Sequence, residues 1–255
     1  MITYPNFKIN IGLNIVAKRA DGFHELQTVF YPVDTLKDVL EINRIEKGMR
    51  LSVRNVDNLC SDEDNLCVKA FRLLQQHFDI DGVEIKLTKN IPFGAGLGGG
   101  SADAAFALKM YNELFQLQLS SLELRDLAAR LGSDTAFFVE NSPVYATGRG
   151  EIMTPINLDL SDYKIEVIKP DFSISTKEAY AGVHPQQPEI NLNELIQNPI
   201  SEWKHCIHND FEDTLFVKYP QLQEIKDDFY ARGAVYASMS GSGSAVYGIF
   251  DKIKN

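Results

Sequence analysis

The sequence predicts an α+β protein, and three observations lead to that fold class. Apolar residues recur at every second position in some segments, which is the period of a strand. In others they recur at every third or fourth position, which is the period of a helix. Five glycines crowd into residues 94–100, directly before one of the helical segments. Because strands and helices mix in irregular order along 255 residues, the chain is expected to be α+β, with room for two domains or one large one.

The predicted strands follow alternating patterns. The N-terminal strand spans about residues 7–16, and its two faces separate by residue type: Phe7, Ile9, Ile11, Leu13 and Ile15 on one, Lys8, Asn10, Gly12 and Asn14 on the other. Lys8 and Asn10 are therefore expected to point the same way. Further strands are expected over residues 26–32, 38–45, 50–54, 83–88, 144–147, 164–168 and 245–250.

The predicted helices follow apolar stripes and capping residues. One stripe consists of Leu66, Ala70, Leu73 and His77, and the helix after the glycines carries Ala104, Leu108, Tyr111 and Phe115. Capping pairs at Ser120 with Glu123 and at Ser175 with Glu178 open two more helices, the first of which should stop at Gly132. A last helix begins near residue 220, with Leu222, Ile225 and Phe229 inward. The pattern closes at the turn 148–150 and restarts near 156, which predicts domains 1–155 and 156–255.

The glycine run predicts an anion-binding loop, because glycines let backbone N–H groups converge and the following helix adds its N-terminal donors. Gly94-x-Gly96-x-x-Gly99 also fits a dinucleotide fingerprint. The half-polar strand before it and the helical region after it argue against that design. A Walker A loop fails because Gly100 stands where its lysine must be. A flexible linker is the remaining alternative, and the amphipathic helix that follows disfavours it.

The residues around this loop resemble the GHMP small-molecule kinases, whose central motif is Pro-x-x-x-Gly-Leu-x-x-Gly-Ser-(Ser/Ala). The matching residues are Pro92, Gly96, Leu97, Gly100, Ser101 and Ala102. Segments 7–13, 18–28, 131–134, 209–212 and 238–244 resemble other parts of the family in the same order. The resemblance implies a two-domain GHMP kinase fold, with a ribosomal protein S5 domain 2-like N-terminal domain, a ferredoxin-like C-terminal domain and the active site in the cleft between them.

It also implies an ATP-binding loop. The residues expected to bind ATP are Pro92, Phe93, Gly94, Ala95, Gly96, Leu97, Gly98, Gly99, Gly100, Ser101 and Ala102.

The same resemblance assigns two catalytic residues. Asp134 follows Leu131-Gly132-Ser133 and is expected to take the proton from the substrate hydroxyl. Lys8 is expected to lie beside it, where a cation favours the ionised carboxylate and can meet charge on the transferring phosphoryl group. Without the resemblance, Asp134 could be only a charge at a helix N-terminus, and Lys8 only an exposed strand lysine.

Segment 18–28 resembles the family members that phosphorylate a cytidine diphosphate-linked polyol. There, two aromatic residues sandwich the cytosine and a histidine meets its polar edge, which implies Phe23, Tyr180 and His24 in this chain, with Asn10 as a further substrate contact. The alternatives are core packing for the two aromatics and a surface imidazole for His24. At position 208 this chain has a histidine, where the family commonly has an arginine before the Asn-Asp-Phe-Glu segment.

Two alternative functions also remain open. The chain could be another GHMP kinase, for mevalonate, homoserine or a sugar, or a silent nucleotide-binding module.

Composition narrows the partners. The formal charge of -10 argues against a nucleic-acid surface, so the expected partners are small molecules, with no nucleic acid, membrane or obligate protein partner. An acidic enzyme that binds ATP also needs local neutralisation of phosphate charge, which predicts Mg²⁺, with Ser101 as a candidate ligand or, alternatively, a plain N-cap. No cleavable signal and no long apolar run is found, which predicts a cytoplasmic protein.

The cysteines are interpreted as reduced structural thiols. Cys60, Cys67 and Cys206 are an odd number without paired metal-ligand spacing. His205, Cys206 and His208 lie close in sequence, but with no fourth ligand nearby they do not predict a zinc site.

Overall fold

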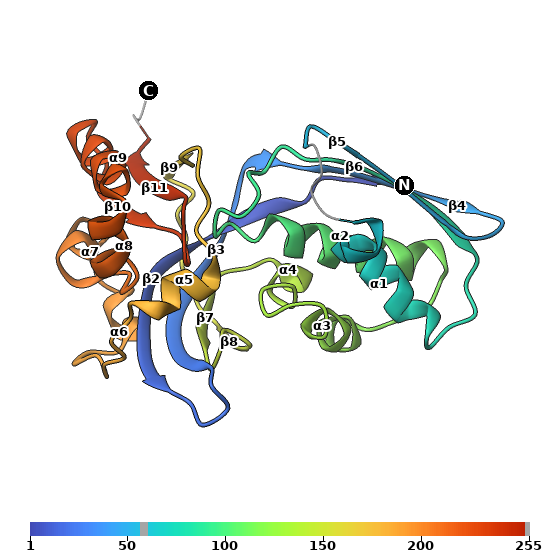
Figure 1. Cartoon of the computed structure of the whole chain (residues 1–255), viewed down its shortest axis with the longest axis horizontal. Helices are drawn as coiled ribbons and strands as arrows, with labels where there is room; N and C mark the ends of the chain where they lie inside the picture. The colour runs from blue at the N-terminus through green and yellow to red at the C-terminus, as the bar shows by residue number, and fades with distance from the viewer. Residues whose placement is uncertain (57–60, 253–255) are drawn as a thin grey trace. The chain divides into compact units, whose positions relative to one another are not determined.

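The computed structural model describes residues 1–56 and 61–252. It divides the chain into two compact units. Unit 1 contains Met1–Phe7, Leu36–Phe93 and Gly98–Ser142; unit 2 contains Lys8–Thr35, Gly94–Leu97 and Pro143–Asn255. Figure 1 shows helices and sheets in both units, so the predicted α+β class is confirmed. The predicted boundary between residues 155 and 156 stays a prediction.

Unit 1 is built on a four-stranded sheet in the order β1-β4-β6-β5. The strands are β1 (Ile2–Thr3), β4 (Val39–Ile45), β5 (Met49–Arg54) and β6 (Gly82–Thr88). The central strand β6 pairs antiparallel with β4 and parallel with β5. Its Val83, Ile85 and Leu87 are buried while Lys86 is exposed, as the alternating pattern predicted. Strand β6 ends at Thr88, shortly before the glycine run in sequence.

The helices of unit 1 are η1 (Asp62–Asp64), α1 (Leu66–Gln75), α2 (Gly99–Leu114), α3 (Ser121–Ala129) and α4 (Phe137–Glu140). In Figure 1, α1 and α2 lie along the same side of this sheet. Helix α2 buries Ala104, Leu108 and Tyr111 of its predicted stripe. The capping box of Ser120 with Glu123 is present, but α3 ends at Ala129. The predicted stop at Gly132 is therefore wrong, because the chain leaves the helix in a turn before it reaches the glycine.

Unit 2 holds most of a sheet in the order β2-β3-β7-β8 and a second sheet in the order β10-β11-β9. Its strands are β2 (Asn6–Lys18), β3 (His24–Lys37), β7 (Val144–Thr147), β8 (Ile152–Pro155), β9 (Tyr163–Ile168), β10 (Tyr236–Met239) and β11 (Val246–Asp251). Strand β2 is buried on both faces as far as Leu13. Its polar residues Lys8 and Asn10 are consequently buried and not exposed to solvent.

The helices of unit 2 are α5 (Thr176–Ala181), α6 (Leu192–Leu195), α7 (Ile200–Cys206), α8 (Glu212–Lys218) and α9 (Pro220–Ala231). Helix α9 packs on β10 and β11, and α7 packs on β10. The buried Leu222 and Phe229 of α9 join the core that also holds Leu13 and Ile15 of β2. This core places β2 next to the C-terminal elements.

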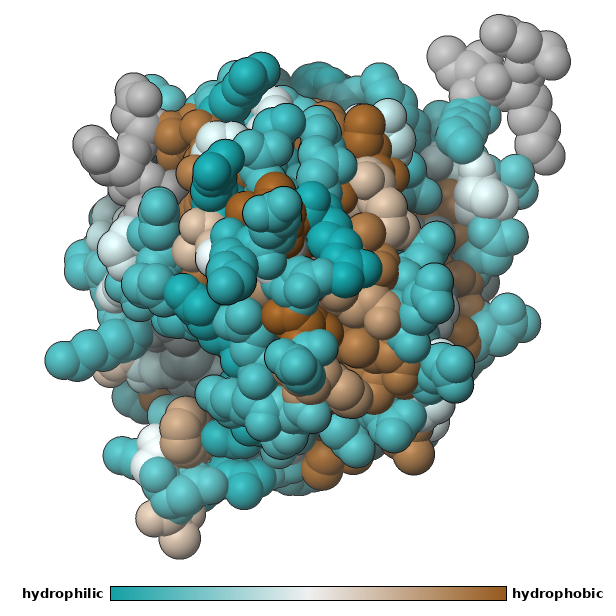
Figure 2. Space-filling view, turned by 90° about the vertical axis from the view of Figure 1, so that its right-hand side faces the viewer, coloured by the Kyte–Doolittle hydropathy of each residue, from teal (hydrophilic) through white to brown (hydrophobic). Residues whose placement is uncertain are grey.

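The face shown in Figure 2 is mostly hydrophilic, and hydrophobic residues are exposed on it in small groups. Cys67 is buried in α1 and Cys206 is half-buried, and both are thiols and not halves of a disulfide. Cys60 lies outside the described residues. Over residues 1–56 and 61–252, no helix is both long and apolar enough to cross a membrane.

Candidate active site

The glycine run forms a loop whose backbone only glycine adopts readily. Gly94, Gly96 and Gly98 have φ angles of 64°, 75° and 70°, so every second residue is left-handed. Such alternation turns successive backbone N–H groups toward one side, and the resulting concavity binds anions. Ala95 and Leu97, between these glycines, are buried. The loop therefore has the backbone expected of a phosphate cradle, anchored by the buried apolar side chains of Ala95 and Leu97.

Helix α2 begins inside the glycine run. Its N-cap is Gly98, and its first helical hydrogen bond runs from the Ala102 N–H to the Gly98 carbonyl, at 2.8 Å. The N–H groups of residues 99–101 precede that bond and form the donor end of the helix. Ser101 is the third residue of α2, so its alternative interpretation as a plain N-cap is wrong.

The glycines at the start of α2 differ in what they require. A Cβ on Gly99 would lie 2.9 Å from Ile91 Cγ2, which is too close. A Cβ on Gly100 would meet only Leu66 Cδ1, at 3.8 Å, which is ordinary contact. The protein's own packing in the described structure does not require a glycine at position 100. That this position leaves the helix N-terminus open to a ligand stays a prediction.

The remaining loop residues lie around this core. Pro92 is half-buried, Phe93 is 60% exposed, and Ala102 is buried in the first turn of α2.

Lys8 is buried in unit 2, and its alternative as an exposed strand lysine is wrong. Only 3% of its surface is accessible. Its Nζ donates to Asn10 Oδ1 at 2.5 Å and to the Gly96 carbonyl at 3.0 Å, and it lies 5.0 Å from the centroid of the Phe30 ring. The contact with Asn10 confirms that the two side chains point the same way. The ammonium group is thus bonded directly to the glycine loop.

The second glycine- and serine-rich segment meets the first at this point. The Ser240 hydroxyl donates to the Gly96 carbonyl at 3.0 Å and accepts from the Asn10 N–H at 3.2 Å. The Ala245 N–H donates to the Ala95 carbonyl at 3.1 Å. A Cβ on Gly96 would lie 2.1 Å from the Ser240 carbonyl oxygen, so this approach requires a glycine. Three segments that are far apart in sequence, around Lys8, Gly96 and Ser240, therefore converge in unit 2.

Asn10 uses its whole side chain within this cluster. Its Nδ2 donates to Thr28 Oγ1 at 2.9 Å, and the Thr28 hydroxyl donates to the Gly12 carbonyl at 2.6 Å. The amide orientation of Asn10 is fixed from both ends, which directs its oxygen at Lys8. A direct role of Asn10 in substrate binding stays a prediction.

Asp134 lies in unit 1, in a turn three residues before α4, and is half-buried. It lies two residues before Ala136, the N-cap of α4, so a charge near a helix N-terminus stays an open alternative for it. A Cβ on Gly132 would lie 3.1 Å from Thr135 Oγ1 and 3.9 Å from Ser101 Oγ. The Gly132-Ser133-Asp134 turn is therefore a neighbour of the first turn of α2. Its pairing with Lys8, a residue of unit 2, stays a prediction.

The three residues predicted for the cytosine lie in unit 2. His24 stacks on Tyr180 with ring centroids 4.7 Å apart, and Tyr180 meets Phe211 edge-on at 4.9 Å. Burial, with a further contribution from Lys18, lowers the pKa of His24, which favours the neutral ring. Phe23 is 53% exposed, which excludes core packing, and the Arg149 guanidinium lies 4.8 Å from the centroid of its ring. The sequence did not indicate Arg149.

Unit 1 contains a buried ionic cluster around Lys89, the residue that follows β6. Lys89 pairs with Asp38 and, at 2.6 Å, with Asp103, and all three residues are almost fully buried. Asp38 also accepts from the N–H groups of Asn90 and Ile91, at 2.6 and 2.8 Å. The cluster thereby joins β4, the first residues after β6 and the second turn of α2.

Two carboxylates share one lysine in this cluster. Burial, aided by the charge of Asp38, raises the pKa of Asp103 to about 8. Burial alone would lower the pKa of Lys89, but the two carboxylates outweigh it and the net shift is upward. Sequence reasoning missed this cluster, and the only signal was a lysine and an aspartate flanking the glycine run.

The comparisons with known proteins agree with these motifs. A model of the GHMP kinases N terminal domain matches residues 65–142, and one of the GHMP kinases C terminal domain matches residues 192–254. The 4-diphosphocytidyl-2-C-methyl-D-erythritol kinase of Bacteroides thetaiotaomicron is 53% identical over 254 residues, 98% of this chain and 92% of that protein. The enzyme of the same name from Parabacteroides distasonis is 47% identical over 99% of this chain and 92% of that protein.

Solved structures give the same result. A crystal structure of 4-(cytidine 5'-diphospho)-2C-methyl-D-erythritol kinase matches with a TM-score of 0.85 and 31% identity, covering 98% of this chain and 90% of that one. A mevalonate kinase matches with a TM-score of 0.73 at 16% identity, covering 98% and 91%, which shows the shared fold alone. The order of motifs, the loop geometry and these near full-length matches lead to one conclusion: the chain belongs to the GHMP kinase family.

Proposed function

We propose that this protein is an ATP-dependent kinase that phosphorylates the 2-hydroxyl of 4-diphosphocytidyl-2-C-methyl-D-erythritol, giving the 2-phosphate and ADP, in non-mevalonate isoprenoid synthesis in the cytoplasm. The observation that carries the proposal is the direct bond from buried Lys8 Nζ to the Gly96 carbonyl of the glycine loop. This hydrogen bond places the Lys8 ammonium group beside the proposed phosphate-binding loop. The names of relatives up to 53% identical over nearly the whole chain support the choice of acceptor.

The proposed chemistry divides between two residues. Asp134 accepts the proton of the acceptor hydroxyl as that oxygen attacks the γ-phosphorus, and the β–γ bridging oxygen leaves with ADP. Lys8 supplies positive charge near the transferring phosphoryl group. Because phosphoryl transfer leaves little covalent chemistry to the protein, most of the acceleration is expected from positioning and charge.

Phosphate charge is proposed to be neutralised at the start of α2. The left-handed glycines and the N–H groups of residues 99–101 offer uncharged donors there. Within residues 1–56 and 61–252, no group of three or more His, Cys, Asp and Glu side chains could hold a metal ion. That fits Mg²⁺, which takes one or two protein oxygens together with substrate phosphates, and the Ser101 hydroxyl is suited to provide one. When bound, Mg²⁺ would offset charge on the β- and γ-phosphates.

A coupled assay of ADP release tests the function. The purified protein is incubated with ATP and, in turn, the cytidyl polyol, mevalonate, homoserine and galactose. We expect turnover with the cytidyl polyol alone. Turnover with a different alcohol would replace the proposed acceptor. ATP binding without turnover on any of the four would instead support a silent nucleotide-binding module.

Substitution of the two proposed catalytic residues tests the mechanism. We expect Asp134→Asn and Lys8→Ala each to lower kcat by about a hundredfold or more, because each removes a group that acts in the transition state. The melting temperature of Asp134→Asn should stay near that of the wild type, since Asp134 is only half-buried. Near-normal kcat in either variant would refute its assigned role.

Substitution of Phe23 tests the cytosine site. Phe23→Leu keeps an apolar side chain at an exposed position but removes the aromatic face. Stacking on a base is worth about 1–3 kcal/mol, so the KM for the cytidyl polyol should rise by about tenfold while the KM for ATP stays unchanged. Tyr4→Leu, at a similarly exposed position with no assigned role, is the matched control and should leave both KM values unchanged. An equal rise in both KM values for Phe23→Leu would contradict a role specific to cytosine.

A further inference from the structure

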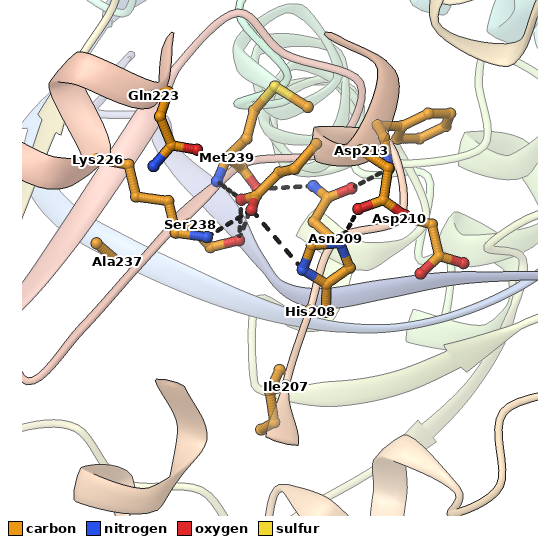
Figure 3. A network of polar contacts seen from close by, with 12 residues as sticks. Ile207, His208, Asn209, Asp210, Asp213, Gln223, Lys226, Ala237, Ser238 and Met239 are labelled. Atoms are coloured by element: carbon orange, nitrogen blue, oxygen red, sulfur yellow. Dashed lines mark hydrogen bonds and ion pairs between the residues drawn. The ribbon is translucent and has the colours of Figure 1, made fainter. Parts of the chain in front are cut away.

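The Asn-Asp-Phe-Glu segment, residues 209–212, has no role in the mechanism described so far, yet it is among the most enclosed polar stretches of unit 2. Asn209 is completely buried and Glu212 is 3% exposed. Figure 3 shows Asn209 next to Ser238 and Met239, whereas Asp210 bonds to Asn14 and Ile15. Buried polar groups at such a density need a structural or functional reason.

Asn209 holds the backbone on both sides of Ser240. Its Nδ2 donates to the Met239 carbonyl at 2.8 Å and to the Gly241 carbonyl at 2.9 Å. Its Oδ1 accepts from the Phe211 N–H at 3.1 Å, which fixes the orientation of the amide. The amide of Asn209 therefore donates to the two backbone carbonyls that flank Ser240.

Glu212 secures the residues immediately before that serine. Its Oε1 accepts from the Ser238 hydroxyl at 2.8 Å and from the Met239 N–H at 2.7 Å, and its Oε2 pairs with Lys226 at 2.5 Å. Figure 3 displays these contacts as one connected network. The carboxylate is thus paired and hydrogen-bonded, as a buried charge must be.

The segment is also fastened to β2, the strand that carries Lys8. The Leu13 N–H donates to the His208 carbonyl and the Asp210 N–H donates to the Leu13 carbonyl, both at 2.9 Å. Asp210 Oδ2 accepts from the Ile15 N–H at 2.6 Å. The residues on both sides of Asn209 are therefore hydrogen-bonded to the backbone of Leu13, which holds Asn209 against β2.

These contacts close a ring that ends at Lys8. From Asn209 it passes through the carbonyls of residues 239 and 241 to Ser240, whose hydroxyl bonds to the Gly96 carbonyl at 3.0 Å. The same carbonyl accepts from Lys8 Nζ at 3.0 Å. Lys8 and Leu13 both belong to β2, and Leu13 bonds to the residues on either side of Asn209, so the circuit of contacts is closed. Each link is buried or part-buried, so water does not readily replace it.

We propose that Asn209 is a positioning residue for Lys8: through Ser240 it fixes the Gly96 carbonyl and thereby the ammonium group and the glycine loop. The inference rests on the proposed function, in which Lys8 acts on the transferring phosphoryl group. A displacement of about 1 Å in a catalytic group can cost about a hundredfold in rate, so a residue that touches no substrate can still control turnover.

A double-mutant cycle separates this role from simple stabilisation. The value of kcat is measured for the wild type, Asn209→Ala, Lys8→Ala and the double variant, with active fractions normalised by titration with a non-hydrolysable ATP analogue. We expect Asn209→Ala to lower kcat by about tenfold or more in the wild type and to have little further effect in Lys8→Ala, because neighbours in one network are not additive. Additive effects in the cycle would overturn the proposal.

Tyr230→Phe is the matched control. The Tyr230 hydroxyl also bonds to the backbone of β10, at Ala237, but it lies outside the ring. The control should lower the melting temperature and leave kcat unchanged. If Asn209→Ala does not fold, Ser240→Ala takes its place in the cycle, because it removes one hydroxyl from the same ring.

A crystal structure of the folded variant gives a readout that does not depend on the acceptor. We expect Lys8 Nζ to have left hydrogen-bond distance of the Gly96 carbonyl. Retention of the wild-type contacts of Lys8 with Gly96 and Asn10 would overturn the proposal. If the wild-type protein turns over none of the alcohols, the proposed function fails, and this structure alone decides the role of Asn209.

Discussion

Single residues of the glycine loop serve different purposes that the sequence does not separate. Gly94, Gly96 and Gly98 are required by their positive φ angles, and Gly96 also by the Ser240 carbonyl. Gly99 is required by Ile91, whereas Gly100 meets no obstacle among the described residues. One run of glycines therefore contains a backbone requirement, a packing requirement and, at position 100, a glycine that packing does not require, where we predict space for a ligand.

Gly100→Ala tests the last of these. Alanine fits the space beside Leu66 and is the better helix former, so the melting temperature should be unchanged or rise. The added methyl group would stand at the donor end of α2, and the KM for ATP should increase by about tenfold, as for the loss of one bond to a charged group. Thermal unfolding and ATP titration measure the two quantities.

Gly96→Ala is the contrasting variant. Its Cβ would collide with the Ser240 carbonyl oxygen and occupy a left-handed backbone, so stability and activity should fall together. If Gly100→Ala binds ATP as the wild type does, the space at position 100 is not for phosphate.

At the scale of elements, a buried cluster in unit 1 joins the start of β4, the residues just after β6 and helix α2. Asp103 in α2 and Asp38 before β4 share Lys89 at the end of β6. The pKa of Asp103 is raised to about 8, so the folded state holds a proton that the unfolded state releases near pH 4. Between these values the folded state binds more protons at Asp103, so the contribution of Asp103 to stability falls as the pH rises.

Asp103→Asn tests this pH dependence. The amide resembles the protonated carboxyl, so near pH 4 the variant and the wild type should unfold at similar temperatures. As the pH rises toward 8, the variant should become progressively more stable relative to the wild type, because it has no carboxyl to ionise. Asp79→Asn, at an exposed position of unit 1, is the control. A constant difference between Asp103→Asn and the wild type from pH 4 to 8 would contradict the assignment.

Elements with strong local patterns were predictable. Strand β2, the alternation in β6 and the capping box of α3 are confirmed, because each depends on residues near in sequence. The short helices α6, α7 and α8 and the strands β8 and β10 were missed, whereas a helical stretch was expected where α4 lies. Elements of four to seven residues contain too few positions for a period to show, and tertiary packing selects them.

At the scale of the whole molecule, the order of the elements in sequence is not their order in space. Strand β2 belongs to unit 2 from Lys8 onward, although residues 36–93 of unit 1 follow it in the chain. The glycine loop likewise contributes Gly94–Leu97 to unit 2 and its helix to unit 1. Each unit is assembled from separate stretches of the chain, and local periodicity contains no information about such assembly.

The sequence by itself determined the α+β class and, through resemblance, the family; the anion-binding loop and the catalytic residues are its predictions. Tertiary structure alone decided that Lys8 is buried and bonded to Gly96, and that Asn209 reaches Ser240. It also decided that Lys89 holds two aspartates. The physical reason is the range of the interactions. Backbone propensity and capping act over a few residues, whereas buried polar groups are satisfied by whichever partners the fold brings to them.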